Sequence, residues 1–121
     1  MGEKGYVYVL TNPSFREDWV LRSDRTEVII TAFHEMRHAY QGYCIRAQSR
    51  EPQSTLDKWE YETLNYIMPS GKNNEIDDES YLKQEIEIDA IAFAHKMMLD
   101  HFRLKTVLPS SIREHVNLKL L

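Results

Sequence analysis

Two histidines and a glutamate stand at a spacing that can bind a metal ion and use it. His34, Glu35 and His38 form the pattern H-E-x-x-H inside Asp24–Gln48, a stretch that we predict to be helical. Residues four apart lie one helical turn above each other, so both imidazoles can reach one zinc ion while Glu35 points at its bound water. Zinc lowers the pKa of that water to about 7, and a carboxylate can then take the proton as a general base. The pattern predicts a zinc site.

Such a site needs a third protein ligand. The extended spacing H-E-x-x-H-x-x-G-x-x-H is absent, because Gln41 and Cys44 occupy its last two defined places. We expect Cys44 to be a small core residue. The alternative is a glutamate from a second helix, and Glu85, Glu87 and Asp89 lie in one. Steps of two residues rotate by about 200° around a helix, so at least one of these carboxylates should face the core, where an unpaired charge is costly.

The elements that must position these groups are mostly helical. Asp24–Gln48 opens with a capping-box pattern, and its regular apolar stripe is expected to be buried. That stripe is Ile29, Phe33, Met36, Tyr40 and Tyr43, and a mixed stripe of Ile30, His34, His38, Gln41 and Ile45 runs beside it. Ser80–Phe102 has helical spacing as well. A short last helix should start within Pro109–Glu114, with a second capping box from Ser111.

Two segments leave room for β-structure. Gly5–Leu10 is rich in β-branched and aromatic residues and reads as a strand. Trp59–Met68 fits a helix and a strand about equally. We therefore expect an α+β fold that is mostly helical: the H-E-x-x-H helix faces the second, Glu-bearing helix, beside a small sheet that includes Gly5–Leu10 and, if it is a strand, Trp59–Tyr66.

Length and charge narrow the function classes. The 121 residues fit a single domain, 1–121, in which 1–22 forms an N-terminal strand segment that can have a separate origin. The net charge of −4 gives no reason to expect a nucleic-acid partner. No apolar run is long enough for a membrane helix. One cysteine and no apolar leader favour a reducing, cytoplasmic location.

Two segments together resemble the ImmA/IrrE-type zincin metallopeptidases of mobile elements. They are I-I-T-A-F-H-E-M-R-H-A-Y-Q (Ile29–Gln41) and Q-E-I-E-I-D-A-I-A-F-A (Gln84–Ala94). The resemblance implies a Zn²⁺ site in which Glu87 is the third ligand, with Glu85 as second choice. It also implies a hydrogen bond to a ligand histidine, which Asp89 can supply. The chain departs from the family at Ile91, where an asparagine is common.

A second resemblance concerns the start of the chain. Gly5–Phe15 (G-Y-V-Y-V-L-T-N-P-S-F) is similar to the opening strand of GIY-YIG-type nuclease domains. The second strand of that family is missing, since Trp19-Val20 leads straight into the metal-binding helix. A strand that supports the fold is the favoured interpretation, and a nuclease fragment is the less favoured one.

These observations lead to one main functional hypothesis and one main alternative. The first is a zinc-dependent peptidase with Glu35 as general base and a protein or peptide substrate, which the resemblance suggests is a regulatory protein of a mobile element. Gln41, Tyr66 and Tyr81 are candidates for contacting the substrate or its oxyanion. The alternative is a zinc-binding regulatory domain without turnover, but such a domain has no use for Glu35. The oligomeric state stays open.

Overall fold

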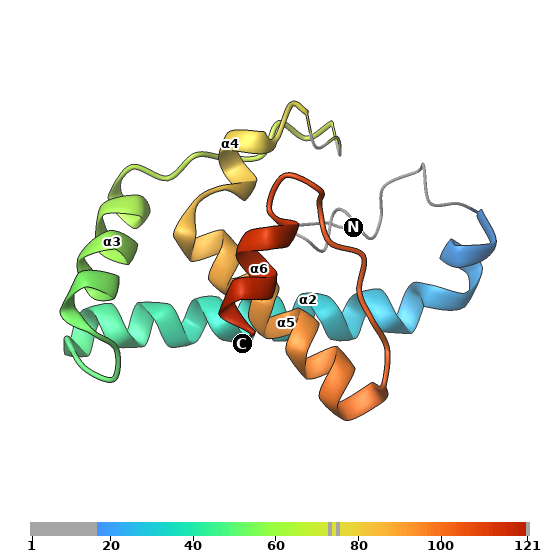
Figure 1. The fold of residues 1–121 in the computed structure, drawn as a ribbon, viewed down its shortest axis with the longest axis horizontal. Coiled ribbons are helices and arrows are strands. Elements are labelled where there is room, and N and C mark those ends of the chain that lie inside the picture. The colour runs from blue at the N-terminus through green and yellow to red at the C-terminus, as the bar shows by residue number, and fades with distance from the viewer. Residues whose placement is uncertain (1–16, 73, 75, 121) are drawn as a thin grey trace.

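The computed structural model describes residues 17–72, 74 and 76–120, and every regular element in this part of the chain is a helix (Figure 1). In chain order the helices are α2 (Glu17–Ala47), α3 (Gln53–Leu64), α4 (Glu79–Leu82), α5 (Glu85–Phe102) and α6 (Arg113–Lys119). The expected sheet is therefore wrong for the described residues. Trp59–Tyr66 lies mainly in α3, where burial recurs every three residues at Leu56, Trp59 and Glu62. The strand expected over Gly5–Leu10 falls outside the described residues.

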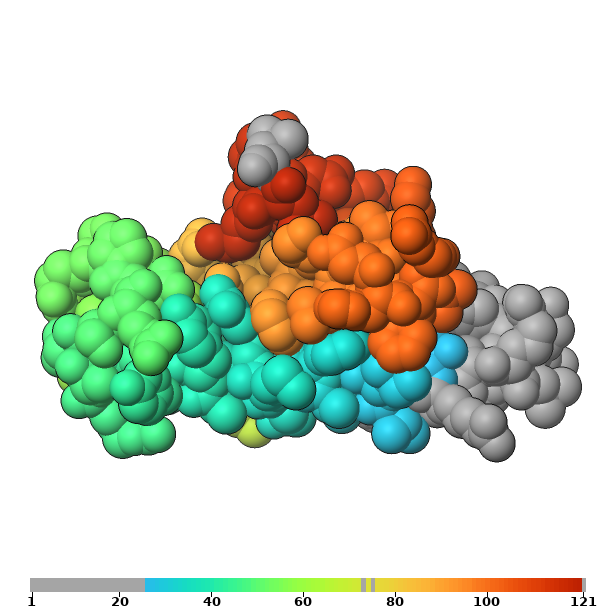
Figure 2. Space-filling view, turned by 90° about the horizontal axis from the view of Figure 1, so that it is seen from below, coloured from blue at the N-terminus to red at the C-terminus, as the bar shows by residue number. Residues whose placement is uncertain are grey.

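Two helices organise the molecule. α2 runs along its length, α5 crosses α2, and α6 packs on α5 (Figure 1). α3 returns beside the end of α2, so it forms one end of the elongated shape seen in Figure 2. None of the helices in the described part of the chain is long and apolar enough to span a membrane.

The core consists of two apolar clusters on either side of the α2–α5 crossing. The larger one joins α2, α4, α5, α6 and the segment before α6, with Ile30, Leu82, Ile88, Ile91, Met98, Leu108, Ile112 and Val116 among its members. The smaller cluster holds α3 and comprises Cys44, Leu56, Trp59 and Ile86. Cys44 is fully buried with a free thiol, which confirms its expected place in the core.

The most deeply buried face of α2 is the mixed stripe, whereas Phe33 of the apolar stripe is only partly buried where it packs on Phe93 and Phe102 of α5. Met36 and Tyr43 are exposed by 53% and 46%, so their expected burial is wrong. Ile30, His34 and Gln41 are buried instead. The polar members of this stripe can be buried because carboxylates on α5 supply hydrogen-bond partners to them.

The helix ends also differ from the capping-box expectations. α2 begins at Glu17, so Asp24 lies within the helix and does not start it. α6 follows Ile112 without a side-chain cap, so the box expected from Ser111 does not form. The helix expected over Ser80–Phe102 is two helices, because the backbone becomes extended at Gln84 (φ −62°, ψ 136°). That break has a structural role at the site.

Candidate metal centre

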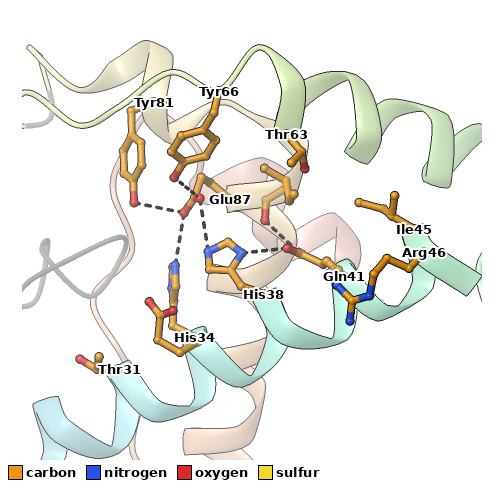
Figure 3. Close-up of a pocket in the computed structure, with 13 residues that line it drawn as sticks. Thr31, His34, His38, Gln41, Ile45, Arg46, Thr63, Tyr66, Tyr81 and Glu87 are labelled. Atoms are coloured by element: carbon orange, nitrogen blue, oxygen red, sulfur yellow. Dashed lines mark hydrogen bonds and ion pairs between the residues drawn. The ribbon is translucent and has the colours of Figure 1, made fainter.

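His34, His38 and Glu87 come together where α2 and α5 face each other (Figure 3). His34 Nε2 lies 3.2 Å from Glu87 Oε1, and His38 Nε2 lies 3.3 Å from Glu87 Oε2. One ligand atom from each residue lies within 4.8 Å of the others. The three residues therefore form a group that could hold a metal ion.

The distances between these atoms suit a small tetrahedral ion. An ion with bonds of about 2.0–2.1 Å keeps its ligand atoms about 3.3–3.4 Å apart. The two nitrogen–oxygen distances, 3.2 and 3.3 Å, are close to that value but run to different oxygens of Glu87, and the three ligand atoms together lie within 4.8 Å of one another. Two imidazoles and one carboxylate are also a donor set that zinc accepts, with a fourth position left for water. The residues present fit the metal that the sequence predicts.

Glu87 is a fully buried carboxylate whose two oxygens each receive two polar contacts. Besides the imidazoles, Tyr81 donates its hydroxyl to Oε1 at 3.1 Å and Tyr66 donates to Oε2 at 2.6 Å. Burial alone would raise the pKa of Glu87, but the hydrogen bonds and charges of His34 and His38 hold that pKa well below its usual range. The group is therefore an anion, and a buried anion needs a cation beside it.

Both tyrosines stay protonated beside this anion. The pKa values of Tyr66 and Tyr81 are raised far above the ordinary 10. Burial is the largest cause in both cases, and the charge of Glu87 is the second. A hydroxyl that keeps its proton remains a hydrogen-bond donor. The side chains of Tyr66 and Tyr81 contact Glu87 on the side opposite the histidines, as Figure 3 shows.

The orientation of Gln41 determines which nitrogen of His38 carries a proton. The Gln41 amide nitrogen donates to the carbonyl oxygen of Ile86 at 3.0 Å and to Asp89 Oδ2 at 2.8 Å. Both partners can only accept, so the amide oxygen must be the atom that faces His38 Nδ1, 2.8 Å away. Nδ1 is therefore the donor. In the neutral imidazole, Nε2 then presents its lone pair to the site, which is the form that binds metal.

That lone pair would repel the Glu87 carboxylate if nothing lay between them. Either a second proton on His38 or a metal ion resolves the contact. Burial lowers the pKa of His38, but the hydrogen bond and charge of Glu87 outweigh that effect and raise it above 6.5. The site thus attracts positive charge, whether as a proton or as a cation.

Asp89 supports the site through Gln41 and does not touch a histidine ring directly. Arg37 holds its carboxylate with two contacts, from Nε at 2.7 Å and from Nη2 at 3.2 Å. The hydrogen bond to a ligand histidine that the resemblance assigned to Asp89 is thus made by Gln41, which Asp89 orients. Gln41 is buried with its amide engaged at both ends, and this occupies the groups that were expected to contact substrate.

Glu62 on α3 fixes the start of α5. Its carboxylate accepts hydrogen bonds from the backbone N–H groups of Glu85 and Ile86, at 2.9 and 2.8 Å. The first N–H groups of a helix have no partner within it, and a negative charge there is favourable. Sequence reasoning missed this contact, although Glu62 continues the three-residue buried spacing of α3, and an acid on a buried face signals a distant partner.

Gln84 holds the segment that carries Tyr66. Its amide oxygen accepts from the Ile67 N–H at 2.9 Å, and its nitrogen donates to the Ile67 and Tyr81 carbonyl oxygens at 3.1 and 2.9 Å. This pairing explains the break between α4 and α5, since an extended Gln84 reaches both neighbours. No local sequence signal indicates such a pairing.

The group opens into a pocket of about 580 Å³. Its lining includes all three candidate ligands, Tyr66, Tyr81 and the exposed Glu35. Glu85, the second-choice ligand, is not among them: its carboxylate lies 3.3 Å from Lys119 Nζ. The structure therefore brings together every predicted site residue except Glu85, with Asp89 one contact further out.

No protein-family model, curated protein or solved structure matches this chain. What the site can do must accordingly be argued from its own geometry, which is that of a buried His-His-Glu group in a helical domain, able to bind a metal ion.

Proposed function

We propose that this protein is a zinc-dependent peptidase of the H-E-x-x-H type, with His34, His38 and Glu87 as ligands. One observation supports it most: the buried carboxylate of Glu87 lies 3.2 and 3.3 Å from the Nε2 atoms of His34 and His38, and a metal cation between these groups would bind all three. The resemblance to ImmA/IrrE-type zincins supports the same assignment.

Each protein group then has a separate task. Zinc held by these residues would lower the pKa of a bound water and polarise the carbonyl of a peptide bond. Glu35 lines the same pocket and is solvent-exposed, so it takes a proton from the attacking water and returns it to the departing amine nitrogen. Gln41 keeps His38 in the tautomer that leaves Nε2 free for the metal.

The tyrosines divide two further tasks between them. Tyr81 is 6% exposed and holds Glu87 in place. Tyr66 is 38% exposed and lines the pocket, so its single hydroxyl proton, which Glu87 accepts at 2.6 Å, would turn to the substrate's carbonyl oxygen as negative charge develops there. The substrate is a protein or peptide, and by the resemblance it is a regulatory protein of a mobile element.

Metal content and cleavage of a labelled, unfolded protein test the proposal together. We expect about one zinc per chain in the wild type and in Glu35→Gln, and none in His34→Ala. His101→Ala is the matched control, because His101 is exposed at the end of α5. A folded wild type that takes up no zinc contradicts the proposal.

Cleavage separates a peptidase from a metal-binding regulatory domain. The zinc-loaded wild type should cut the labelled protein, and Glu35→Gln should cut it at least about 100-fold more slowly, since general-base catalysis contributes about 10²–10⁴-fold. Glu60→Gln, an exposed change on α3, should leave the rate unaltered. A zinc-loaded wild type that cuts no faster than the buffer alone would favour the regulatory alternative, and equal cleavage by Glu35→Gln would contradict the role of Glu35 as general base.

A further inference from the structure

Arg46 is the one lysine or arginine among the described residues that line the pocket. Arg37 is paired with Asp89, and Arg50 lies over the ring of Tyr43 at 5.7 Å. Arg46 is exposed, and no carboxylate among the side chains described in residues 26–72, 74 and 76–120 pairs with it. The pocket thus contains a positive charge that has no counter-ion of its own.

Gly42 lets this guanidinium lie close to the helix. A Cβ at position 42 would come within 3.2 Å of Arg46 Nη1, so a larger residue would push the guanidinium away. Figure 3 shows the Arg46 side chain running back along α2 toward Gln41. Gly42 thus leaves room for the guanidinium beside the helix.

The guanidinium is therefore level with Gly42, one turn beyond His38. Four helical residues advance about 6 Å, and an extended peptide advances about 3.3 Å per residue. The lining of the same pocket includes the apolar side chains of Ile45 and Ile86. A peptide whose scissile carbonyl lies at the metal group can therefore place a side chain or its terminus at Arg46 within two residues.

We infer that Arg46 binds a carboxylate of the substrate within two residues of the cleaved bond. The inference rests on the proposed function and adds a substrate class to it. A guanidinium pairs with a carboxylate through two parallel hydrogen bonds, and with the unpaired charge in a pocket such a pair selects acidic substrates. The carboxylate can come from an aspartate or glutamate side chain or from the peptide's C-terminus.

Sequencing of cleaved bonds in a peptide mixture tests this directly. With the zinc-loaded wild type, acidic residues should be enriched about fivefold over neutral ones within two residues of the cut, as for a partly exposed ion pair. Arg46→Gln should remove the enrichment, and Arg46→Glu should replace it with enrichment of lysine and arginine. Arg50→Gln is the matched control and should keep the wild-type pattern. If instead the cuts cluster at the last bonds and disappear when the C-termini are amidated, the carboxylate is the terminal one.

A binding measurement keeps the inference separate from turnover. Calorimetry with zinc-loaded Glu35→Gln should show N-acetylated Ala-Ala-Glu-Ala amide binding about fivefold tighter than the all-alanine amide, and Arg46→Gln should equalise the two. Cleavage or binding without acidic preference overturns this inference alone. A wild type that binds zinc but cuts no peptide overturns the proposed function and this inference with it.

Discussion

The first turn of α5 and the rest of the same helix meet their neighbours in opposite ways. At its start α5 contributes Glu87, which is fully buried among polar groups, and Asp89, which is bound by Arg37. From Ala90 to Met98 the buried side chains are almost all apolar. Burying charges costs desolvation that their pairing roughly offsets, whereas burying apolar surface is a net gain. The start of α5 therefore carries the site together with two core residues, Ile86 and Ile88, whereas the rest of the helix contributes almost only apolar packing.

The largest effect is expected from Glu87→Gln. The amide keeps the shape of the side chain but removes the anionic ligand, so zinc affinity should fall by more than the 10- to 100-fold typical for loss of an outer hydrogen-bond partner. Competition with a chelating dye measures it, and the helical circular dichroism should persist. Glu85→Gln, two residues earlier, should change affinity less than about twofold, given its place outside the pocket. The reverse result would exchange the two assignments.

Met98→Ala should produce the opposite pattern at the apolar end. Met98 is completely buried, and removing such a side chain typically costs about 2–5 kcal/mol in the free energy of unfolding. Denaturant titration measures the loss, while zinc uptake by the folded fraction should stay at one per chain. Ile91→Val, with an expected loss of about 0.5–1.5 kcal/mol, covers the case in which Met98→Ala does not fold. Loss of zinc uptake in folded Ile91→Val would show that the two ends are coupled.

Gln41→Leu tests whether the polar end works as a network. Without the amide, His38 loses the acceptor that selects its tautomer, so zinc affinity should fall about 10- to 100-fold. Dye competition is again suitable, with the exposed Gln53→Leu as control. A zinc affinity within twofold of the wild type would contradict this role of Gln41 and would show that Glu87 alone is enough to orient His38.

The smallest effect concerns a histidine at the apolar end. Burial, followed by the charge of Lys105, lowers the pKa of His95, whose Nδ1 lies 2.6 Å from Thr106 Oγ1. The unfolded chain then binds this proton more readily. The free energy of unfolding should therefore decrease as the pH falls below 6.5 and level off below the folded-state pKa.

Measurement in a Glu87→Gln background removes the Glu87 carboxylate, and the two histidines of the group are then common to both variants compared. There, His95→Gln should reduce the dependence of unfolding free energy on pH between about 7.5 and 5. An unchanged slope would show that other groups cause it.

The part of the site that helix geometry dictates could be predicted from the sequence. His34 and His38 had to share a face, and at least one carboxylate of the second helix had to face the core, as Glu87 does. The choice of Glu87 over Glu85 came from the family resemblance, because a two-residue alternation shows only that one of them faces inward.

Contacts between distant segments could not be predicted. Glu62 caps α5 from 23 residues away, and the Tyr66 hydroxyl reaches Glu87 from 21. Neither depends on a local pattern. The buried face of α2 was misjudged for the same reason: hydropathy favours Met36 over Gln41, and only the partners supplied by α5 reverse that order.

The two helices of the candidate metal group are far apart along the chain, since Glu87 lies 53 positions after His34. An unfolded chain would lose about 4 kcal/mol of conformational freedom in closing such a loop around one ion. A metal ion would therefore bind the folded chain in preference to the unfolded one. At a free concentration 100-fold above its dissociation constant, it would increase the free energy of unfolding by about 2.7 kcal/mol. Because the ligands close this long loop, the metal concentration would affect the stability of the fold as well as the activity of the site.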